Sequence, residues 1–325
     1  MPQVNPTTCP AYGTSSRNVN GNCRWPGTYQ VPTISSPAAI TGARVHVAGD
    51  MNIGESSTLT VAESTVRVDG KMTLGGASVS NFYNSEFFVA KNVAIGESNK
   101  SAFHGPTAIA ARGNLSLGGA GRLEFFDDAT FFVGGDMSIG GSGVLVFHDD
   151  LVAFVDGDLT ISGSGTLTFN SSATFYVAGS VKIQGSGWTR GSGGSNTPWI
   201  VFYVRKGVEI SGAAGAGSSI PDAVFLLDTE PAYSQYAVTL TGSASLYGGV
   251  YAPTRVIKVQ GTSPVTGSLI GKTLEIPSWR QEKEFRDKYD QHAERMRSFH
   301  LPSRTRTRGS EQLLEWREVE PWAID

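Results

Sequence analysis

The chain has 325 residues, a net charge of −3 and only 17% charged residues, so no overall basic charge points to nucleic acid or an anionic membrane. Forty glycines with so little charge are typical of a β protein with many corners. The sequence contains no run of about 18 apolar residues, so it predicts no transmembrane helix. The first residues lack the basic and apolar regions of a signal peptide, which fits an intracellular protein or a mature or truncated form of an exported one.

Residues 1–37 are predicted to form an N-terminal arm. Its two cysteines, Cys9 and Cys23, enclose thirteen residues that are poor in apolar side chains. A disulfide between them would stabilise the arm by about 3 kcal/mol and would indicate an oxidising compartment. The alternative is two free thiols in a disordered arm. The chain has no further cysteine or histidine pair at metal-ligand spacing, which argues against a zinc site.

The central region repeats with a period of about 22 residues, and a period of this size predicts a solenoid. One position of the repeat, which we call the glycine slot, is occupied by Lys91 in one repeat and by glycine in the six others. These glycines are Gly49, Gly70, Gly113, Gly135, Gly157 and Gly179. Apolar residues stand two positions before, two after and four after each slot, and in four repeats also ten and twelve after it, which is the alternation of strands. Three short strands per repeat predict an all-β, parallel β-helix whose coils stack at about 4.8 Å. We expect right-handed winding, because left-handed β-helices usually have a strict six-residue sub-period.

Two further columns follow from this register. The position twelve after the slot is predicted to form an internal column that fills the core: Val61, Phe82, Phe103, Phe125, Phe147 and Phe169. Polar side chains directly after the slot are expected to stabilise the turn in which each lies: Asp50, Asn92, Asn114, Asp136 and Asp158.

One corner gathers acidic residues. Asp127 and Asp128 stand one full period before Asp149 and Asp150, so the two pairs are expected to stack on adjacent coils, with His104 and His148 just ahead in their own coils. Three interpretations remain open: a solvated corner, a Ca²⁺ or other cation site, or a pair of catalytic carboxylates. We favour the solvated corner, because coil corners normally turn polar residues outward. Known nucleophile, zinc-protease and phosphate-loop motifs are absent, and no other cofactor is expected.

The period is interrupted at residues 185–198, a Gly- and Ser-rich insertion, and strand-like segments resume between 199 and 276. The solenoid is therefore predicted to span residues 38–277, with about ten coils. Trp188 and Trp199 near the insertion are candidate contacts for a ligand or partner, although Trp199 also fits the start of a core strand.

Residues 278–325 differ in composition, with 20 charged residues among 48. Ser278 and Gln281 form a capping box, and 279–299 are predicted to form a helix whose apolar residues make a sparse stripe: Trp279, Phe285, Tyr289 and Met296. Such a stripe favours a helix that lies along another surface. Residues 302–310 are predicted to be a linker, and 311–325 a short docking segment.

Residues 247–276 resemble the β-solenoid region of PilX-like, pilus-assembly-associated bacterial surface proteins. The shared pattern is Tyr-Gly-x-x-Tyr-Ala-Pro from Tyr247 to Pro253, followed by Gly267, Gly271 and Lys272, and the ending LLEWREVEPW is similar too. The resemblance implies display at the cell surface beside a type IV pilus-like machine. That group begins with a prepilin-type leader and a hydrophobic helix, which residues 1–325 do not include, so a leader removed from this chain and an anchor on a separate chain both remain open. The glycine-punctuated coils are also somewhat similar to bactofilins, which are shorter, polymer-forming β-helices.

We therefore expect a non-catalytic extracellular structural or adhesive protein whose partners are pilus or cell-surface subunits or surface glycans. Two alternatives remain: a polysaccharide-active enzyme that uses the Asp127 and Asp149 pairs, and a bactofilin-like cytoskeletal polymer.

Overall fold

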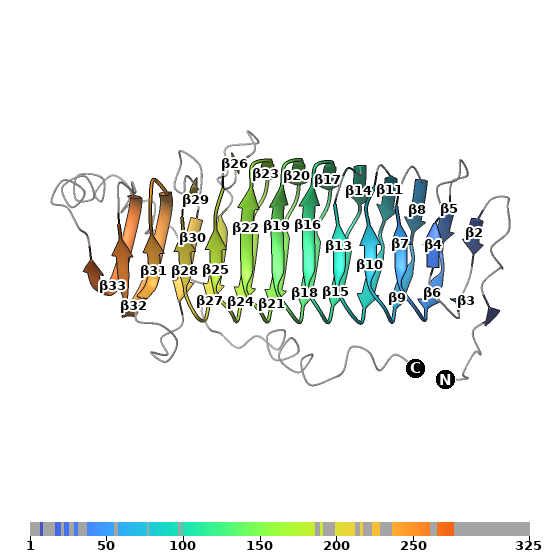
Figure 1. The fold of residues 1–325 in the computed structure, drawn as a ribbon, viewed down its shortest axis with the longest axis horizontal. Coiled ribbons are helices and arrows are strands. Elements are labelled where there is room, and N and C mark those ends of the chain that lie inside the picture. Colours follow the sequence, from blue (N-terminus) through green and yellow to red (C-terminus); the bar gives the residue numbers. More distant parts are fainter. Residues whose placement is uncertain are drawn as a thin grey trace.

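The computed structural model describes residues 38–275, except 55–57, 77, 97, 99, 186–188, 191–198, 212–214, 217–222, 228–235 and 261–264, together with four short N-terminal strands. These residues form strands, turns and bends that stack into one rod (Figure 1). Three predicted features lie outside the described residues: the Cys9 end of the disulfide, Trp188, and the whole tail 278–325.

Each coil contains three strands. In one coil, β18 (Ala129–Val133) is followed by β19 (Met137–Gly141) and β20 (Val144–Phe147), and β21 (Leu151–Val155) begins the next coil. Ala129 pairs with Leu151, so the period of the sequence is also the register of strand pairing. Neighbouring coils pair in parallel throughout, and the predicted parallel β-helix is confirmed with about nine turns.

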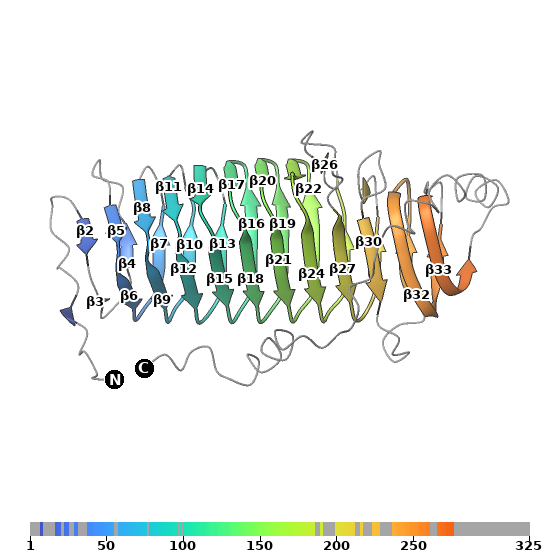
Figure 2. The same ribbon diagram turned by 180° about the vertical axis from the view of Figure 1, so that it is seen from behind.

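The strands fall into three columns, which we call faces 1, 2 and 3 after their order in the coil, and Figure 2 shows them from behind. Face 1 contains β3 (Cys23–Trp25), β6 (Arg44–Val47), β9 (Thr65–Val68), β12 (Glu86–Val89), β15 (Thr107–Ala111), β18, β21, β24 (Ala173–Val177), β27 (Ile200–Val204) and β30 (Ala223–Leu227). Face 2 contains β4 (Tyr29–Val31), β7 (Met51–Ile53), β10 (Met72–Leu74), β13 (Val93–Ile95), β16 (Leu115–Gly119), β19, β22 (Leu159–Gly163), β25 (Val181–Ile183), β28 (Val208–Ile210) and β31 (Tyr236–Leu240). Face 3 contains β2 (Arg17–Asn20), β5 (Ala38–Thr41), β8 (Thr58–Ala62), β11 (Val79–Tyr83), β14 (Lys100–His104), β17 (Arg122–Phe125), β20, β23 (Thr166–Phe169) and β26 (Thr189–Arg190).

The two ends of the stack differ from the sequence prediction. Strands β2, β3 and β4 pair with β5, β6 and β7, and β1 (Thr7–Thr8) pairs with β3, so coil pairing extends ahead of residue 38 into the predicted arm. At the other end, four predicted short segments merge into β32 (Ser245–Val259) and β33 (Val265–Glu275), and β29 (Gly215–Ala216) pairs with β32. These long strands keep pairing while they turn from face 1 to face 2, with a register shift between Ala252 and Val256.

The core consists of the alternating apolar positions of the repeat. The residues two before, two after and four after the glycine slot are buried in every repeat, for example Val133, Met137 and Ile139. The predicted internal aromatic column is confirmed: the rings of Phe82, Phe103, Phe125, Phe147 and Phe169 stack with centroids 4.4 to 5.4 Å apart. A second internal set, on face 1, meets this column edge to face, as in Phe125 and Phe131 at 5.5 Å. Because stacked coils put each residue beside its equivalent in the next repeat, one aromatic position per repeat is enough to build a continuous column.

The polar row after the glycine slot bridges coils, which corrects the expectation that each side chain stabilises its own turn. The side-chain oxygen of each residue accepts a hydrogen bond from the backbone N–H of the equivalent residue one coil later. Asn114 Oδ1 accepts from Asp136 N at 3.0 Å, and Asp136 Oδ1 accepts from Asp158 N at 2.9 Å. Asp50, Asn92 and Asp158 do the same toward Lys71, Asn114 and Ser180.

This ladder gives the physical reason for the periodic glycine. A Cβ on Gly135 would lie 2.2 Å from Asn114 Oδ1, and Gly70, Gly113, Gly157 and Gly179 face the same obstacle, at 2.1 to 2.4 Å. Both non-glycine residues in the slot follow a coil without Asp or Asn at the bridging position. Lys91 follows Lys71, and Lys206, which donates its N–H to Gly179 O, follows Ser180. The glycine is therefore required by the side chain of the preceding coil.

Candidate functional site

The acidic corner lies between faces 3 and 1, directly after β17 and β20. Asp128, Asp149 and Asp150 are exposed, and each offers a carboxylate oxygen within 4.8 Å of the others. Asp127 stands apart from this group: its Oδ2 accepts a hydrogen bond from Gly105 N at 2.9 Å. The stacking of the acidic pairs thus brings three of the four predicted residues together.

The carboxylate oxygens of this corner already accept hydrogen bonds from neighbouring backbone and hydroxyl groups. Asp150 Oδ1 accepts from Ser171 Oγ at 2.6 Å and from Ser172 N at 3.1 Å, and Asp149 Oδ1 accepts from Asp150 N at 3.0 Å. Ca²⁺ takes about six to eight oxygen ligands, so three exposed carboxylates would supply only part of its shell. A role in cation binding stays a prediction, and the described contacts are those of a corner that links coils.

An external column of stacked rings flanks the acidic corner. Tyr83, His104, Phe126 and His148 stack in consecutive coils with centroids 4.9, 4.6 and 4.6 Å apart. His148 Nδ1 accepts from Asn170 Nδ2 at 3.1 Å, so its Nε2 donates to Glu124 Oε1 at 3.2 Å. The spacing of the two histidines predicted that they share a register. It did not predict that the rings of Phe126, between the histidines, and of Tyr83, next to His104, belong to the same column.

Glu124 links this column to face 3. Its carboxylate forms two hydrogen bonds with Arg122, at 2.7 and 2.8 Å. The hydrogen bond from Arg122 holds the pKa of Glu124 below its usual range, helped by the bond from His148 and opposed by partial burial. Glu124 therefore stays ionised and binds Arg122 and His148 in place.

A second external column, on face 1, was missed by the sequence analysis. Phe132, Phe154, Tyr176 and Tyr203 stack at 5.2, 4.9 and 4.8 Å with their rings nearly parallel. Burial raises the pKa of Tyr176 and of Tyr203. The sequence did carry a signal, because an aromatic residue stands between two inward positions in each of these repeats. Strand alternation alone assigns such a residue to the solvent side and does not show that its ring stacks on the next one.

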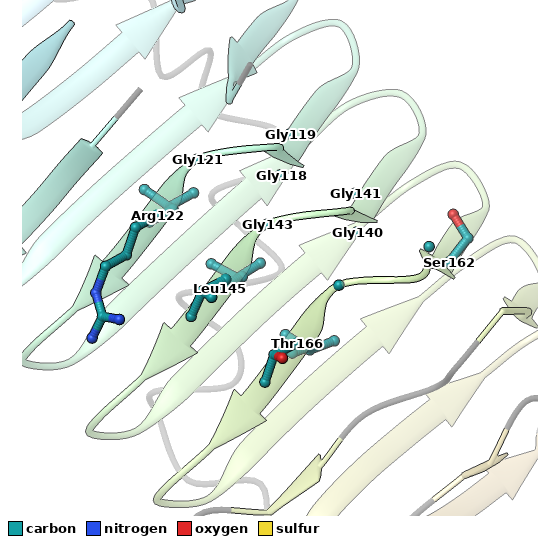
Figure 3. A pocket seen from close by; sticks show the side chains of 15 residues that line it. Gly118, Gly119, Gly121, Arg122, Gly140, Gly141, Gly143, Leu145, Ser162 and Thr166 are labelled. Carbon is teal, nitrogen blue, oxygen red and sulfur yellow. The ribbon is translucent and has the colours of Figure 1, made fainter. Parts of the chain in front are cut away.

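One pocket of the described surface lies in the glycine-rich arc between faces 2 and 3. Figure 3 shows Gly118 and Gly140 in one row on adjacent coils, with Ser162 in the third coil. At Gly141, φ is 133° and a Cβ would lie 2.4 Å from the backbone of Gly119, so only glycine fits at this position of the arc. The volume is about 20 Å³, room for about one water molecule, and Arg122 is the one charged residue in its lining.

The remaining predicted residues are placed only in part. Trp199 is half-buried directly before β27, and its carbonyl accepts a hydrogen bond from Ala173 N at 3.1 Å. Cys23 lies in β3. The resemblance motif falls in β32 and β33, where a Cβ on Gly248 would lie 1.8 Å from Ala223 O. That glycine is thus needed for close coil stacking.

Searches of family models, curated proteins and solved structures gave no match to this chain. Within the described ranges, no helix is long and apolar enough to cross a membrane. What the structure establishes is a β-solenoid, a fold compatible with a structural role.

Proposed function

We propose that this chain is a non-catalytic structural component of a bacterial cell surface, a rigid rod that presents binding surfaces to pilus or other surface subunits or to glycans. The observation that carries the proposal is the continuous parallel pairing of coils from β6 to β33. Such pairing leaves most side-chain chemistry to the corners and the outward columns, because the inward positions are filled by apolar core residues, apart from buried hydroxyls such as those of Ser80 and Ser101. The likeness of residues 247–276 to pilus-associated solenoids supports the location.

The location is tested by protease treatment of intact producing cells, followed by immunoblotting of the chain beside a cytoplasmic marker. We expect loss of the chain while the marker survives, and recovery of the chain with sheared surface filaments. Protection of the chain until the cells are lysed would overturn the surface assignment.

Binding is tested by a glycan array and by capture of purified surface subunits, using the full chain. The matched variants are Asp127→Asn and Asp149→Asn, which remove charge from the acidic corner, and Phe126→Ser, which breaks the adjacent ring column. Retained binding in the Asn variants with loss in the Ser variant would assign recognition to the ring column.

A polysaccharide-active enzyme is the second candidate, favoured by the convergence of Asp128, Asp149 and Asp150. It requires turnover of acidic polysaccharides by the purified chain and its abolition by Asp149→Asn. Turnover that disappears in this variant would replace the structural proposal. The bactofilin-like alternative requires end-to-end filaments, which sedimentation velocity and electron microscopy would detect.

A further inference from the structure

Face 1 carries an uncharged exterior along most of the rod. Its two outward columns run through β15, β18, β21, β24, β27 and β30 and into β32 and β33. Every residue in these two columns is apolar, aromatic, Ser, Thr or Gly. The column containing Phe132 continues through Phe154, Tyr176, Tyr203, Leu226 and Tyr251 to Ile270. We call this column the face 1 ridge.

The ridge remains exposed at several points, and part of the same face is already covered. Tyr176, Tyr251 and Ile270 are 41%, 40% and 47% exposed. In the neighbouring outward column, Val201 and Val224 are only 9% and 1% exposed although they point away from the core. This part of face 1 is therefore shielded from solvent.

The stacking of the rings limits what the ridge can bind. Phe154 and Tyr176 have both ring faces against the rings of the adjacent coils, with interplanar angles of 5° to 6°, so only their edges point outward. A sugar ring stacks on the face of an aromatic ring, and no ring face is available at these two central positions. Ring edges instead suit the apolar side chains of a protein segment.

We infer that the ridge is the docking surface for the chain's own segment 279–299. The described chain ends at Glu275 in β33, where this last strand of the stack has turned onto face 2, and the segment begins nine residues after Ile270, the C-terminal end of the ridge. Phe285, Tyr289, Met296 and Phe299 are spaced by 4, 7 and 3 positions, which places them on one side of a helix.

Length and charge agree with this occupant. Six coil steps from Phe132 to Ile270 span about 29 Å at about 4.8 Å each. A helix of about 21 residues spans about 31 Å at about 1.5 Å per residue. The ridge has no charge to desolvate, and the charged residues of 279–299 can remain on the solvent side of the helix. Docking would cover the exposed aromatic edges of face 1.

The test is hydrogen exchange of the full chain, read by mass spectrometry over peptides from 279–299. We expect amide protection of roughly tenfold or more over the unstructured rate, lost in the double variant Phe154→Ser/Tyr176→Ser. The matched control is Tyr83→Ser, which removes an aromatic side chain of similar exposure, 39%, from the other external column. This control keeps the protection, and peptides from β16 to β25 report whether each variant is folded.

A reciprocal measurement keeps the inference falsifiable if the double variant fails to fold. Phe285→Ser/Tyr289→Ser leaves the solenoid sequence untouched, and hydroxyl-radical footprinting should then show at least a severalfold rise in oxidation of Tyr176 and no change at Tyr83. Absence of protection in the unmodified tail, or footprints that ignore the tail variant, would overturn the inference. A dimer that dissociates in Phe154→Ser/Tyr176→Ser while the tail exchanges freely would assign the ridge to a second copy instead.

Discussion

At the residue scale, the periodic glycine and the polar residue of the coil before it form one unit. Asn114 reaches across to Asp136 N, and its oxygen occupies the place of a Cβ on Gly135. The next nearest atoms to such a Cβ are 3.1 Å away, so the side chain of Asn114 is the main obstacle. The glycine and the bridging side chain are therefore expected to be energetically coupled.

We predict that Gly135→Ala destabilises the fold by about 1–3 kcal/mol through overpacking. Asn114→Ala should cost about 1 kcal/mol for the lost hydrogen bond. In the double variant the two costs should not add, with a coupling of about 1 kcal/mol or more, because removing Asn114 Oδ1 makes room for the new methyl group. Urea denaturation of the four proteins measures this cycle, and strict additivity would refute the coupling.

A pH-dependent contribution is expected from Glu124, whose pKa is lowered chiefly by its hydrogen bond with Arg122. A carboxylate with a lower pKa in the folded state stabilises the fold above its unfolded pKa, and this stability is lost as the pH falls through the folded value. Arg122→Gln should therefore cost less than about 1 kcal/mol at pH 7, because Arg122 is largely exposed. The difference from the unmodified chain should shrink as the pH falls below about 4.3, the ordinary glutamate pKa at which the unfolded chain takes up its proton, and it should vanish once Glu124 is protonated in the folded state as well. A difference independent of pH between 3 and 7 would assign the effect to packing.

At the scale of the element, the strands of the regular coils each contribute two or three inward side chains to columns that run along the rod. Phe147 is 1% exposed and stacks on Phe125 and Phe169, at 4.9 and 5.4 Å. Phe154 has the same residue type but lies in the outward column of the next strand. Inward and outward rings in adjacent strands can therefore be compared directly.

Phe147→Ala is expected to lower the free energy of unfolding by about 3–5 kcal/mol, the usual cost of a large cavity in a core. Phe154→Ala should cost clearly less, because its site opens to solvent and leaves no enclosed cavity. Chemical denaturation of both variants checks the ranking. Equal losses would mean that the outward column is as fully buried as the core.

The elements also show how far the sequence could lead. The glycine register and the alternation around it predicted the inward residues and the aromatic column, because the stacking partner of each residue is simply the next repeat. The ladder through Asn114 was misassigned to a local turn, because its partner lies one full period further along the chain. Pro253 and the following residues broke the pattern into short segments, whereas β32 continues pairing through that bend.

At the scale of the whole molecule, the rod is built from coils that are nearly interchangeable between β15 and β25. The acidic corner could be located from the sequence because it follows the same register. The ridge of face 1 could not be, because outward alternation does not distinguish a solvated aromatic side chain from one that stacks on its neighbours. Removing one complete period should therefore join equivalent corners, whereas removing half a period should not.

The most direct measurement of this equivalence is thermal unfolding, followed by far-ultraviolet circular dichroism, of two deletion variants. Deleting 135–156 removes one complete period and joins Gly134 to Gly157, which restores the glycine beside Asn114. Deleting 135–145 removes half a period and brings inward residues to outward positions. We predict a native-like β spectrum with one cooperative transition for the full-period deletion, and its loss for the half-period deletion. Equal tolerance of the two deletions, or equal damage from both, would contradict the account of the molecule as a rod of equivalent coils.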